Sequence, residues 1–202
     1  ASLYRNGFMP HALCDKWNNI YAQGKGNSEP AQVLVDNQFL LPSTGRALDL
    51  ACGLGENALL LAKQGLTVEA WDISTLGLQK LQEKSASKAL SIKTCVQEIS
   101  ANSFLKNSFD VVVISRFLDR SICNAIMESL NPNGLLFYQT YTQQKVAQVG
   151  PKNPRFLLAE NELLTLFPEL AVVFYAEYSD LGQTNSGLRN EAQFIGRKRC
   201  NL

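Results

Sequence analysis

The stretch Ala47-LDLACGLGENALLLAKQGLTVEAWDI-Ser74 decides how this chain folds. A short apolar run ends at a turn that holds Gly53 and Gly55, where missing side chains let the backbone approach a ligand closely. Apolar residues then recur with the spacing of one helical face until Gly65, and a second apolar run ends on Asp72. The stretch therefore predicts a strand, a glycine turn, a helix and a second strand, which together form half of a nucleoside-binding α/β sheet.

The rest of the chain continues this alternation of strands and helices. Beyond the opening stretch, strands are expected over 91–96, 109–115, 135–141, 171–177 and 191–198, and helices over 12–22, 30–37, 74–89, 119–130 and about 160–167. Asn131-Pro-Asn-Gly134 is a turn signal between a helix and a strand. The final two strands have no helix between them. The pattern predicts a three-layer, doubly wound, seven-stranded, mostly parallel sheet with an antiparallel edge hairpin.

Length and composition limit the classes of protein to consider. The chain of 202 residues suits a single domain, 1–202, in which residues 1–40 form an amino-terminal helical cap. The 19 basic and 18 acidic residues leave a net charge of +1, which argues against nucleic acid as a partner. No apolar run approaches the roughly 20 residues that span a bilayer and no signal peptide is visible, so we expect a cytoplasmic protein without membrane contact. Five scattered cysteines and one histidine argue against a metal site. Nothing in the sequence specifies an oligomeric state.

The glycine turn admits two classes of ligand. Gly53-x-Gly55-x-x-Ala58, followed by Asp72, matches the dinucleotide fingerprint of NAD(P)-dependent enzymes and also suits S-adenosylmethionine. Asp49, inside the first strand, would repel a pyrophosphate but suits a cationic ammonium group. Glu56 stands where the helix begins and would oppose an anionic ligand there by about 1 kcal/mol. The two carboxylates favour the sulfonium ligand over the dinucleotide.

These residues resemble the class I S-adenosylmethionine-dependent methyltransferases. Leu48-DLACGLGEN-Ala58 is similar to the family's first motif, Asp-Leu-Gly-Cys-Gly-x-Gly-x-Asn-Ala, with Ala51 in place of the usual first glycine. The resemblance covers about residues 45–140, and small bacterial members, tellurite-resistance-type methyltransferases among them, are the most similar. It implies a Rossmann-like methyltransferase fold, S-adenosylmethionine as cofactor and S-adenosylhomocysteine as product. The later motifs that carry it are 68–74, 96–99, 108–116 and 130–136.

Carried over motif by motif, the resemblance implies a cofactor site. Asp72 would hold the ribose hydroxyls, and Asp49 would point toward the methionine ammonium. Glu98 takes the place of the family's usual aspartate near the adenine amino group. The other expected contacts are Ile73 and Ile99 on the adenine, Ala51, Cys52, Gly53, Gly55 and Asn57 around the methionine portion, and Ser115 and Arg116 as the floor toward the acceptor. Asn57 serves equally well as a helix cap.

Two aromatic residues and the strand ends complete the prediction. Trp17 and Tyr21 share one face of the first helix and either cover the cofactor or anchor that helix to the core. Ligands of open α/β sheets lie beyond the carboxyl ends of the strands, which places Arg116, Tyr141 and Arg155 near the acceptor. A small anionic or carboxylate-bearing acceptor is suggested by the basic residues of these segments, Arg116, Arg120, Lys145, Lys152 and Arg155.

The chemistry itself demands little of the protein. Methyl transfer from a sulfonium is an in-line displacement that depends mainly on positioning, so no unique catalytic residue is required. The function expected from the sequence is S-adenosylmethionine-dependent methyl transfer to a small-molecule acceptor. The alternatives are an NAD(P)-dependent oxidoreductase and a non-catalytic S-adenosylmethionine-binding module.

Overall fold

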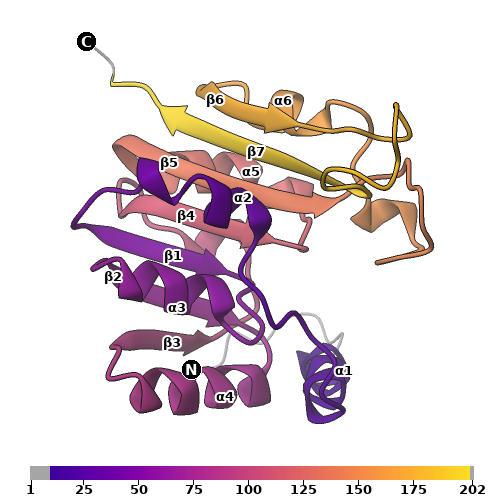
Figure 1. Ribbon diagram of the computed structural model, residues 1–202. Helices are drawn as coiled ribbons and strands as arrows, with labels where there is room; N and C mark the ends of the chain where they lie inside the picture. The colour runs from indigo at the N-terminus through magenta and orange to yellow at the C-terminus, as the bar shows by residue number, and fades with distance from the viewer. Residues whose placement is uncertain (1–9, 201–202) are drawn as a thin grey trace.

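A seven-stranded sheet in the order β3-β2-β1-β4-β5-β7-β6 forms the middle of the protein (Figure 1). The computed structural model describes residues 10–200, so residues 1–9 of the expected amino-terminal cap lie outside the described part. Neighbouring strands from β3 to β5 are parallel, whereas β7 is antiparallel to both β5 and β6. The strands are β1 (Arg46–Leu50), β2 (Thr67–Asp72), β3 (Ile92–Val96), β4 (Phe109–Ser115), β5 (Leu130–Tyr141), β6 (Leu170–Ala176) and β7 (Glu191–Lys198).

Helices cover both faces of this sheet and make three layers. One core packs α2 (Gln32–Asp36), α3 (Glu56–Lys63) and α4 (Thr75–Ser87) on the first face. The second core packs α5 (Cys123–Ser129) and α6 (Glu162–Leu166) on the other face. The β-branched run of β4 shows why both are needed, because Val111 and Val113 enter the first core while Val112 and Ile114 enter the second. The sequence prediction of a three-layer, mostly parallel sheet with an antiparallel edge is confirmed.

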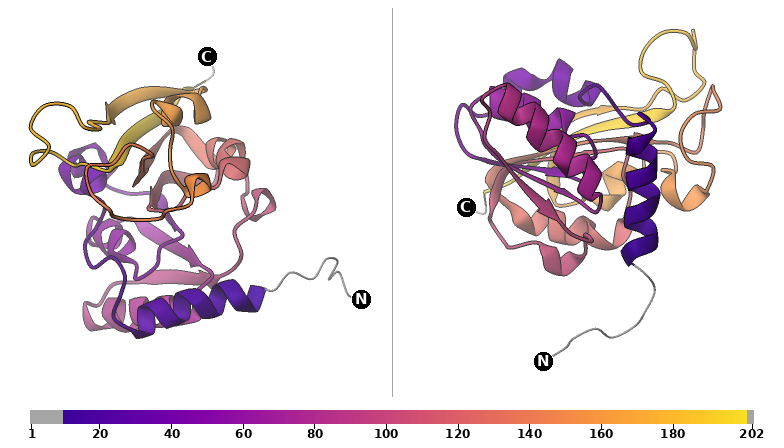
Figure 2. Two further views of the ribbon diagram at one scale, coloured as in Figure 1. Left: turned by 90° about the vertical axis from the view of Figure 1, so that its right-hand side faces the viewer. Right: turned by 90° about the horizontal axis from the view of Figure 1, so that it is seen from below.

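Helix α1 (Pro10–Ala22) lies apart from the two helical layers and packs against the side of α4 (Figures 1 and 2). The side-chain oxygen of Asn18 accepts hydrogen bonds from the Ser74 hydroxyl at 2.7 Å and from the Leu76 backbone N–H at 3.1 Å. Ser74 is itself the N-cap of α4 and accepts a bond from the Gly77 N–H. The amino end of α4 is therefore the surface on which α1 docks.

The expected helix over 119–130 and the turn over 131–134 were wrong in detail. A short 3₁₀ helix (Arg120–Ile122) precedes α5, and β5 already begins at Leu130. Phe109 of β4 pairs with Leu130 and Val111 pairs with Leu135, so the Asn-Pro-Asn-Gly residues form a bulge inside the sheet. Asn131 is held there because its amide donates to Asp110 Oδ1 at 2.8 Å. The turn residues therefore bend the strand without leaving the sheet.

Within residues 10–200, no helix is both long and apolar enough to cross a membrane.

Candidate active site

The glycine turn at the carboxyl end of β1 is held by Asp72, the last residue of β2. Asp72 Oδ2 accepts a hydrogen bond from the Gly53 N–H and Oδ1 accepts one from the Ser74 N–H, both at 2.8 Å. Its side chain is only 6% exposed. Burial raises the pKa of the Asp72 carboxyl, although bonds from backbone N–H groups act in the opposite direction. The neighbouring strands β1 and β2 thereby place a buried carboxylate directly beside the turn.

A second carboxylate, Asp49 of β1, lies fully buried beneath the same turn. Its Oδ2 accepts a bond from the Ala58 N–H at 3.0 Å, and its Oδ1 accepts one from the Asn57 amide at 3.3 Å. Ala58 belongs to the first turn of α3, which begins six residues after the end of β1. Asp49 of β1 therefore satisfies a free N–H group at the start of that helix. Burial raises the pKa of Asp49 to about 7, against the opposing effect of these two hydrogen bonds.

The backbone of the turn adopts left-handed conformations at three positions. Gly53 has φ +56°, Gly55 has φ +76° and Ala51 has φ +53°. The two glycines take this conformation without strain, whereas an alanine there costs about 1–2 kcal/mol. A side chain at Gly55 would also collide with Leu81 of α4, which packs directly on the turn. The residue that departs from the family motif, Ala51, is therefore a strained point of the turn.

Asn57 joins both sides of the site to the amino-terminal segment. Its amide nitrogen also donates to the Ser115 hydroxyl at 3.1 Å, at the end of β4. Its oxygen accepts a bond from the Ala31 N–H at 2.8 Å, just before α2. The buried amide thus contacts three segments of the protein in addition to lying in the first turn of α3. Asn57 does not cap α3, whose N-cap is Gly55 without a side-chain bond, and contact of Asn57 with a ligand stays a prediction.

Tyr21 of α1 is buried against the glycine turn. A Cβ built on Gly53 would lie 2.7 Å from the Tyr21 hydroxyl, and one built on Gly77 would lie 3.1 Å from its ring. Trp17 stacks on Tyr21 with ring centroids 5.8 Å apart and is itself half-buried. Burial, with a smaller contribution from the nearby Asp72 charge, raises the pKa of Tyr21. Tyr21 therefore anchors α1 to the turn, and the role of both rings as a cover stays a prediction.

The remaining predicted cofactor residues follow the ends of β1, β2 and β3 at the same edge of the sheet. Cys52 is half-buried, and desolvation raises the pKa of its thiol well above the ordinary value. Ile73 and Ile99 are half-buried, and Glu98 is exposed. The structure brings the expected residues to one edge, with Glu98 the most open to solvent.

Beyond the carboxyl ends of β4 and β5, Arg116 and Tyr141 lie together. The Arg116 guanidinium lies 5.7 Å from the centroid of the Tyr141 ring, and Lys145 Nζ lies 5.4 Å from the same centroid. Burial raises the pKa of Tyr141, while the Arg116 charge lowers it. Arg155 is different: its side chain is exposed, and its carbonyl accepts a bond from Arg120. Arg116 and Tyr141 thus lie together, whereas the Arg155 side chain makes no hydrogen bond or ion pair with either of them within the described residues.

Sequence reasoning missed the buried partners of Arg116. Arg116 Nε donates to Glu191 Oε1 at 3.0 Å, and Gln139 Nε2 donates to Glu191 Oε2 at 2.7 Å. Glu191 and Gln139 are 5% and 3% exposed. The available signal was Gln139 within the apolar run of β5, since a polar side chain in a buried strand needs a partner.

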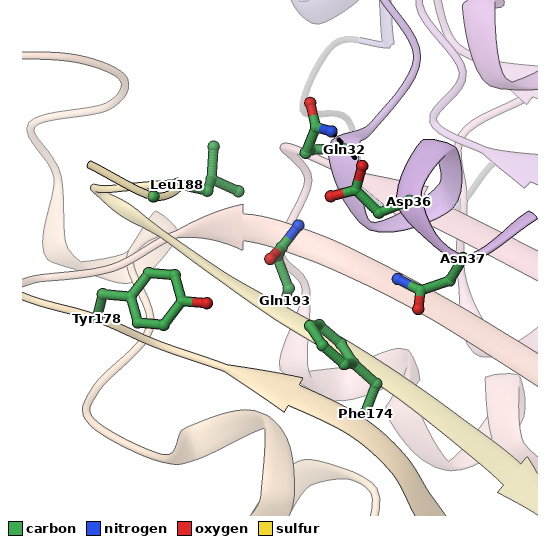
Figure 3. A pocket seen from close by; sticks show the side chains of 8 residues that line it. Gln32, Asp36, Asn37, Phe174, Tyr178, Leu188 and Gln193 are labelled. Atoms are coloured by element: carbon green, nitrogen blue, oxygen red, sulfur yellow. Dashed lines mark hydrogen bonds between the residues drawn. The ribbon is translucent and has the colours of Figure 1, made fainter. Parts of the chain in front are cut away.

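An open pocket of about 600 Å³ lies on the α2 face, beside the edge hairpin (Figure 3). The Gln193 amide points into it between α2 and the Phe174 ring, and also donates to Gln139 at 3.4 Å. The pocket lining contains no lysine or arginine and consists of Gln32, Asp36, Asn37, Phe174, Tyr178, Gly187, Leu188 and Gln193. It is therefore chemically distinct from the cationic region around Arg116.

Comparisons with known proteins agree with this geometry. Residues 47–134, which carry the turn, Asp72 and the end of β4, match the family model described as a methyltransferase domain. The chain is 33% identical over 164 residues to the putative methyltransferase YqeM of Bacillus subtilis, covering 75% of this chain and 58% of that protein. Residues 47–134 are a methyltransferase domain of the class I S-adenosylmethionine-dependent type.

Other members of the family support the assignment. The probable S-adenosyl-L-methionine-dependent methyltransferase TehB of Haemophilus influenzae is 30% identical over 139 residues, or 65% of this chain and 48% of TehB. The crystal structure of TehB from Haemophilus influenzae superposes with a TM-score of 0.69 at 25% identity, covering 91% of this chain and 67% of that one. The chain spans about half the length of the curated relatives that it matches.

Strain at Ala51 leads to the first prediction. Ala51→Gly should raise the free energy of unfolding by about 0.5–1 kcal/mol, because the relief of left-handed strain exceeds the entropy that glycine adds to the unfolded chain. Urea unfolding measures the change. The matched control is Ala47→Gly in β1, where φ is not positive and the same substitution should destabilise the protein. Destabilisation by both changes would contradict the account of Ala51.

The burial of Asp49 leads to a pH dependence. Its folded-state pKa of about 7 lies above the ordinary 3.8, so the folded protein holds this proton more tightly than the unfolded chain does. The resulting stability is present below about pH 4 and is lost as the pH rises through about 7, by at most about 4 kcal/mol. The free energy of unfolding of the wild type should therefore fall more steeply over that interval than that of Asp49→Asn. Asp72 is present in both proteins, so parallel curves would show that Asp49 titrates normally.

Proposed function

We propose that this protein transfers the methyl group of S-adenosylmethionine to a small-molecule acceptor. The observation that carries the proposal is the buried Asp72 carboxylate beside the Gly53 turn, with the second carboxylate, Asp49, beneath that turn. Family membership and the names of the relatives, all methyltransferases, support the same reaction.

The residues at this edge fit the cofactor that the family implies. The left-handed turn at Gly53 and Gly55 leaves its backbone uncovered by side chains of its own. Asp72 retains acceptor capacity, since each of its oxygens takes one of the two backbone bonds described above. We assign Asp72 to the ribose hydroxyls, Asp49 to the ammonium group and Ile73 and Ile99 to the adenine. The bound cofactor would supply an activated methyl group on a cationic sulfur.

The protein would contribute positioning and exclusion of water. Tyr21 of α1 lies against the turn and Trp17 stacks on Tyr21, so residues 10–40 would act as a cap on a single domain. Arg116 and Tyr141, at the ends of β4 and β5, would orient the acceptor toward the methyl group. A displacement that releases a neutral thioether needs no group to stabilise an oxyanion, and correct placement supplies much of the rate enhancement.

An NAD(P)-dependent oxidoreductase is the weaker alternative. A pyrophosphate on the amino end of α3 would meet both Glu56 and the buried Asp49. Lys84 forms an ion pair with Glu56 and offsets part of its charge, but Asp49 forms no ion pair with a described residue. The electrostatics of the turn therefore favour a cationic ligand.

Calorimetric titration tests the cofactor assignment. The wild type should bind S-adenosylhomocysteine and should not bind NADH. Asp72→Asn should weaken S-adenosylhomocysteine binding about tenfold or more, because it removes a charged acceptor and disturbs the Gly53 turn. Asp110→Asn is the matched control, since Asp110 also accepts a backbone N–H, from Arg46, but at the opposite end of the sheet. Binding of NADH alone would overturn the proposal.

A turnover screen separates an enzyme from a binding module. Protein that binds S-adenosylhomocysteine should transfer label from methyl-labelled S-adenosylmethionine to at least one member of a panel of amines, thiols, phenols and carboxylates. Asp72→Asn should lose this transfer in proportion to its loss of cofactor affinity. Transfer to RNA instead would refute the small-molecule acceptor, and tight binding without any transfer would favour the non-catalytic module.

A further inference from the structure

We infer that Arg116 binds a carboxylate group of the acceptor and that Glu191 is the positioning residue that orients Arg116 for this contact. The inference rests on the proposed function and names the chemical class of its acceptor. It goes beyond the family motifs because Glu191 and its partner Gln139 lie in the last third of the chain, outside the matched residues 47–134.

The backbone of Arg116 is held in an unusual conformation just past the end of β4. Its φ is +54°, in the left-handed region, where a residue with a long side chain is strained. The Arg116 N–H donates to the Gln139 carbonyl at 2.8 Å, which continues the pairing of β4 with β5. From this position the side chain reaches Glu191, the first residue of β7. Strain of this kind persists where the surroundings impose it.

The Arg116 side chain is fixed along one edge and open at its end. Its Nε donates to Glu191, and its guanidinium carbon lies over the Tyr141 ring. No described residue accepts a hydrogen bond from the two terminal nitrogens, and the side chain is 37% exposed. Two parallel N–H groups at the open end of a guanidinium match the two oxygens of a carboxylate.

Glu191 is held rigidly enough to do this orienting. Its second oxygen accepts a bond from the buried Gln139 amide, whose own oxygen accepts bonds from the Val33 N–H at 2.9 Å and from Gln193. These contacts leave Glu191 little freedom to follow a mobile arginine. A buried carboxylate bonded on both oxygens therefore sets the direction of the guanidinium.

The charge around this site favours an anion even though Glu191 offsets Arg116. Lys145 lies over the same Tyr141 ring, and its ammonium donates to the carbonyls of Val149 and Pro151, which carry no formal charge. The segment 142–158 contains Lys145, Lys152 and Arg155 and no aspartate or glutamate. Of these, Lys145 shares the Tyr141 ring with Arg116, whereas the pocket of Figure 3 has no basic side chain. An anionic group is therefore directed to Arg116.

Calorimetry on the protein saturated with S-adenosylhomocysteine provides the test, with benzoate as the probe. Benzoate should bind at least about tenfold more tightly than benzamide or benzylamine, which share its ring but lack its charge. Inorganic phosphate is the fourth probe. No benzoate binding, equal binding of benzoate and benzamide, or tighter binding of phosphate would each overturn the carboxylate assignment. Saturation with S-adenosylhomocysteine is measured first, so its failure identifies a failure of the proposed function instead.

Variants then separate Arg116 from Glu191. Arg116→Gln should weaken benzoate binding about tenfold or more, and Arg116→Lys should fall in between, because it keeps the charge but loses the paired N–H groups. Lys106→Gln is the control, since it removes one positive charge near the opposite end of β4. S-adenosylhomocysteine affinity should stay unchanged in Lys106→Gln, and benzoate binding to each Arg116 variant is measured at that variant's own S-adenosylhomocysteine saturation. An equal effect of Lys106→Gln and Arg116→Gln would show that only overall charge matters and would overturn the inference.

A double-mutant cycle tests whether Glu191 acts through Arg116. Glu191→Gln should weaken benzoate binding several-fold in the wild type and should have no further effect in Arg116→Gln, because the residue that it orients is already gone. Additive losses in the double variant would refute the positioning role. Since Arg116→Gln leaves Glu191 buried without its cation, the double variant also serves as the form in which both charges are removed together.

Discussion

The site depends on two carboxylates that are buried beside one turn. An ionised or protonated carboxyl group out of contact with water must find partners, and Asp49 and Asp72 find them in the backbone N–H groups of Ala58, Gly53 and Ser74. These bonds tie the end of β1 to α3 and to the end of β2. The turn can then keep its left-handed backbone, and α4 can pack directly on Gly55.

The amino-terminal segment links the two halves of the site. The Ala31 N–H bonds to Asn57 in the first turn of α3, and the Val33 N–H bonds to Gln139 in β5. Only Gln32 lies between these two residues, so one short piece of chain holds both side chains. Asn18 and Tyr21 fix the preceding α1 to α4 and to the turn. A displacement of this segment would alter the contacts of both Asn57 and Gln139.

Sequence reasoning succeeded where one local pattern dictated the structure. The β-branched run of β4 and the glycine turn each specify their conformation through nearby residues, and both are found where they were expected. The bulge at 131–134 was missed because its turn residues obey the same local preferences, yet Asp110 on the neighbouring strand keeps them in the sheet. Arg155 shared its basic character with Arg116, but only Arg116 has an acidic partner brought to it from a distant strand.

By itself the sequence determined the fold class, the family and the position of the glycine turn, because the spacing of apolar residues and the placement of glycines act within a few residues. The tertiary structure decided which polar residues meet. Gln139 and Glu191 are 52 residues apart, and Arg116 and Glu191 are 75 apart, so no local pattern could have paired them. Their partnership follows from the antiparallel register of β5 and β7, which is set by the packing of both sheet faces and the closing of the edge hairpin.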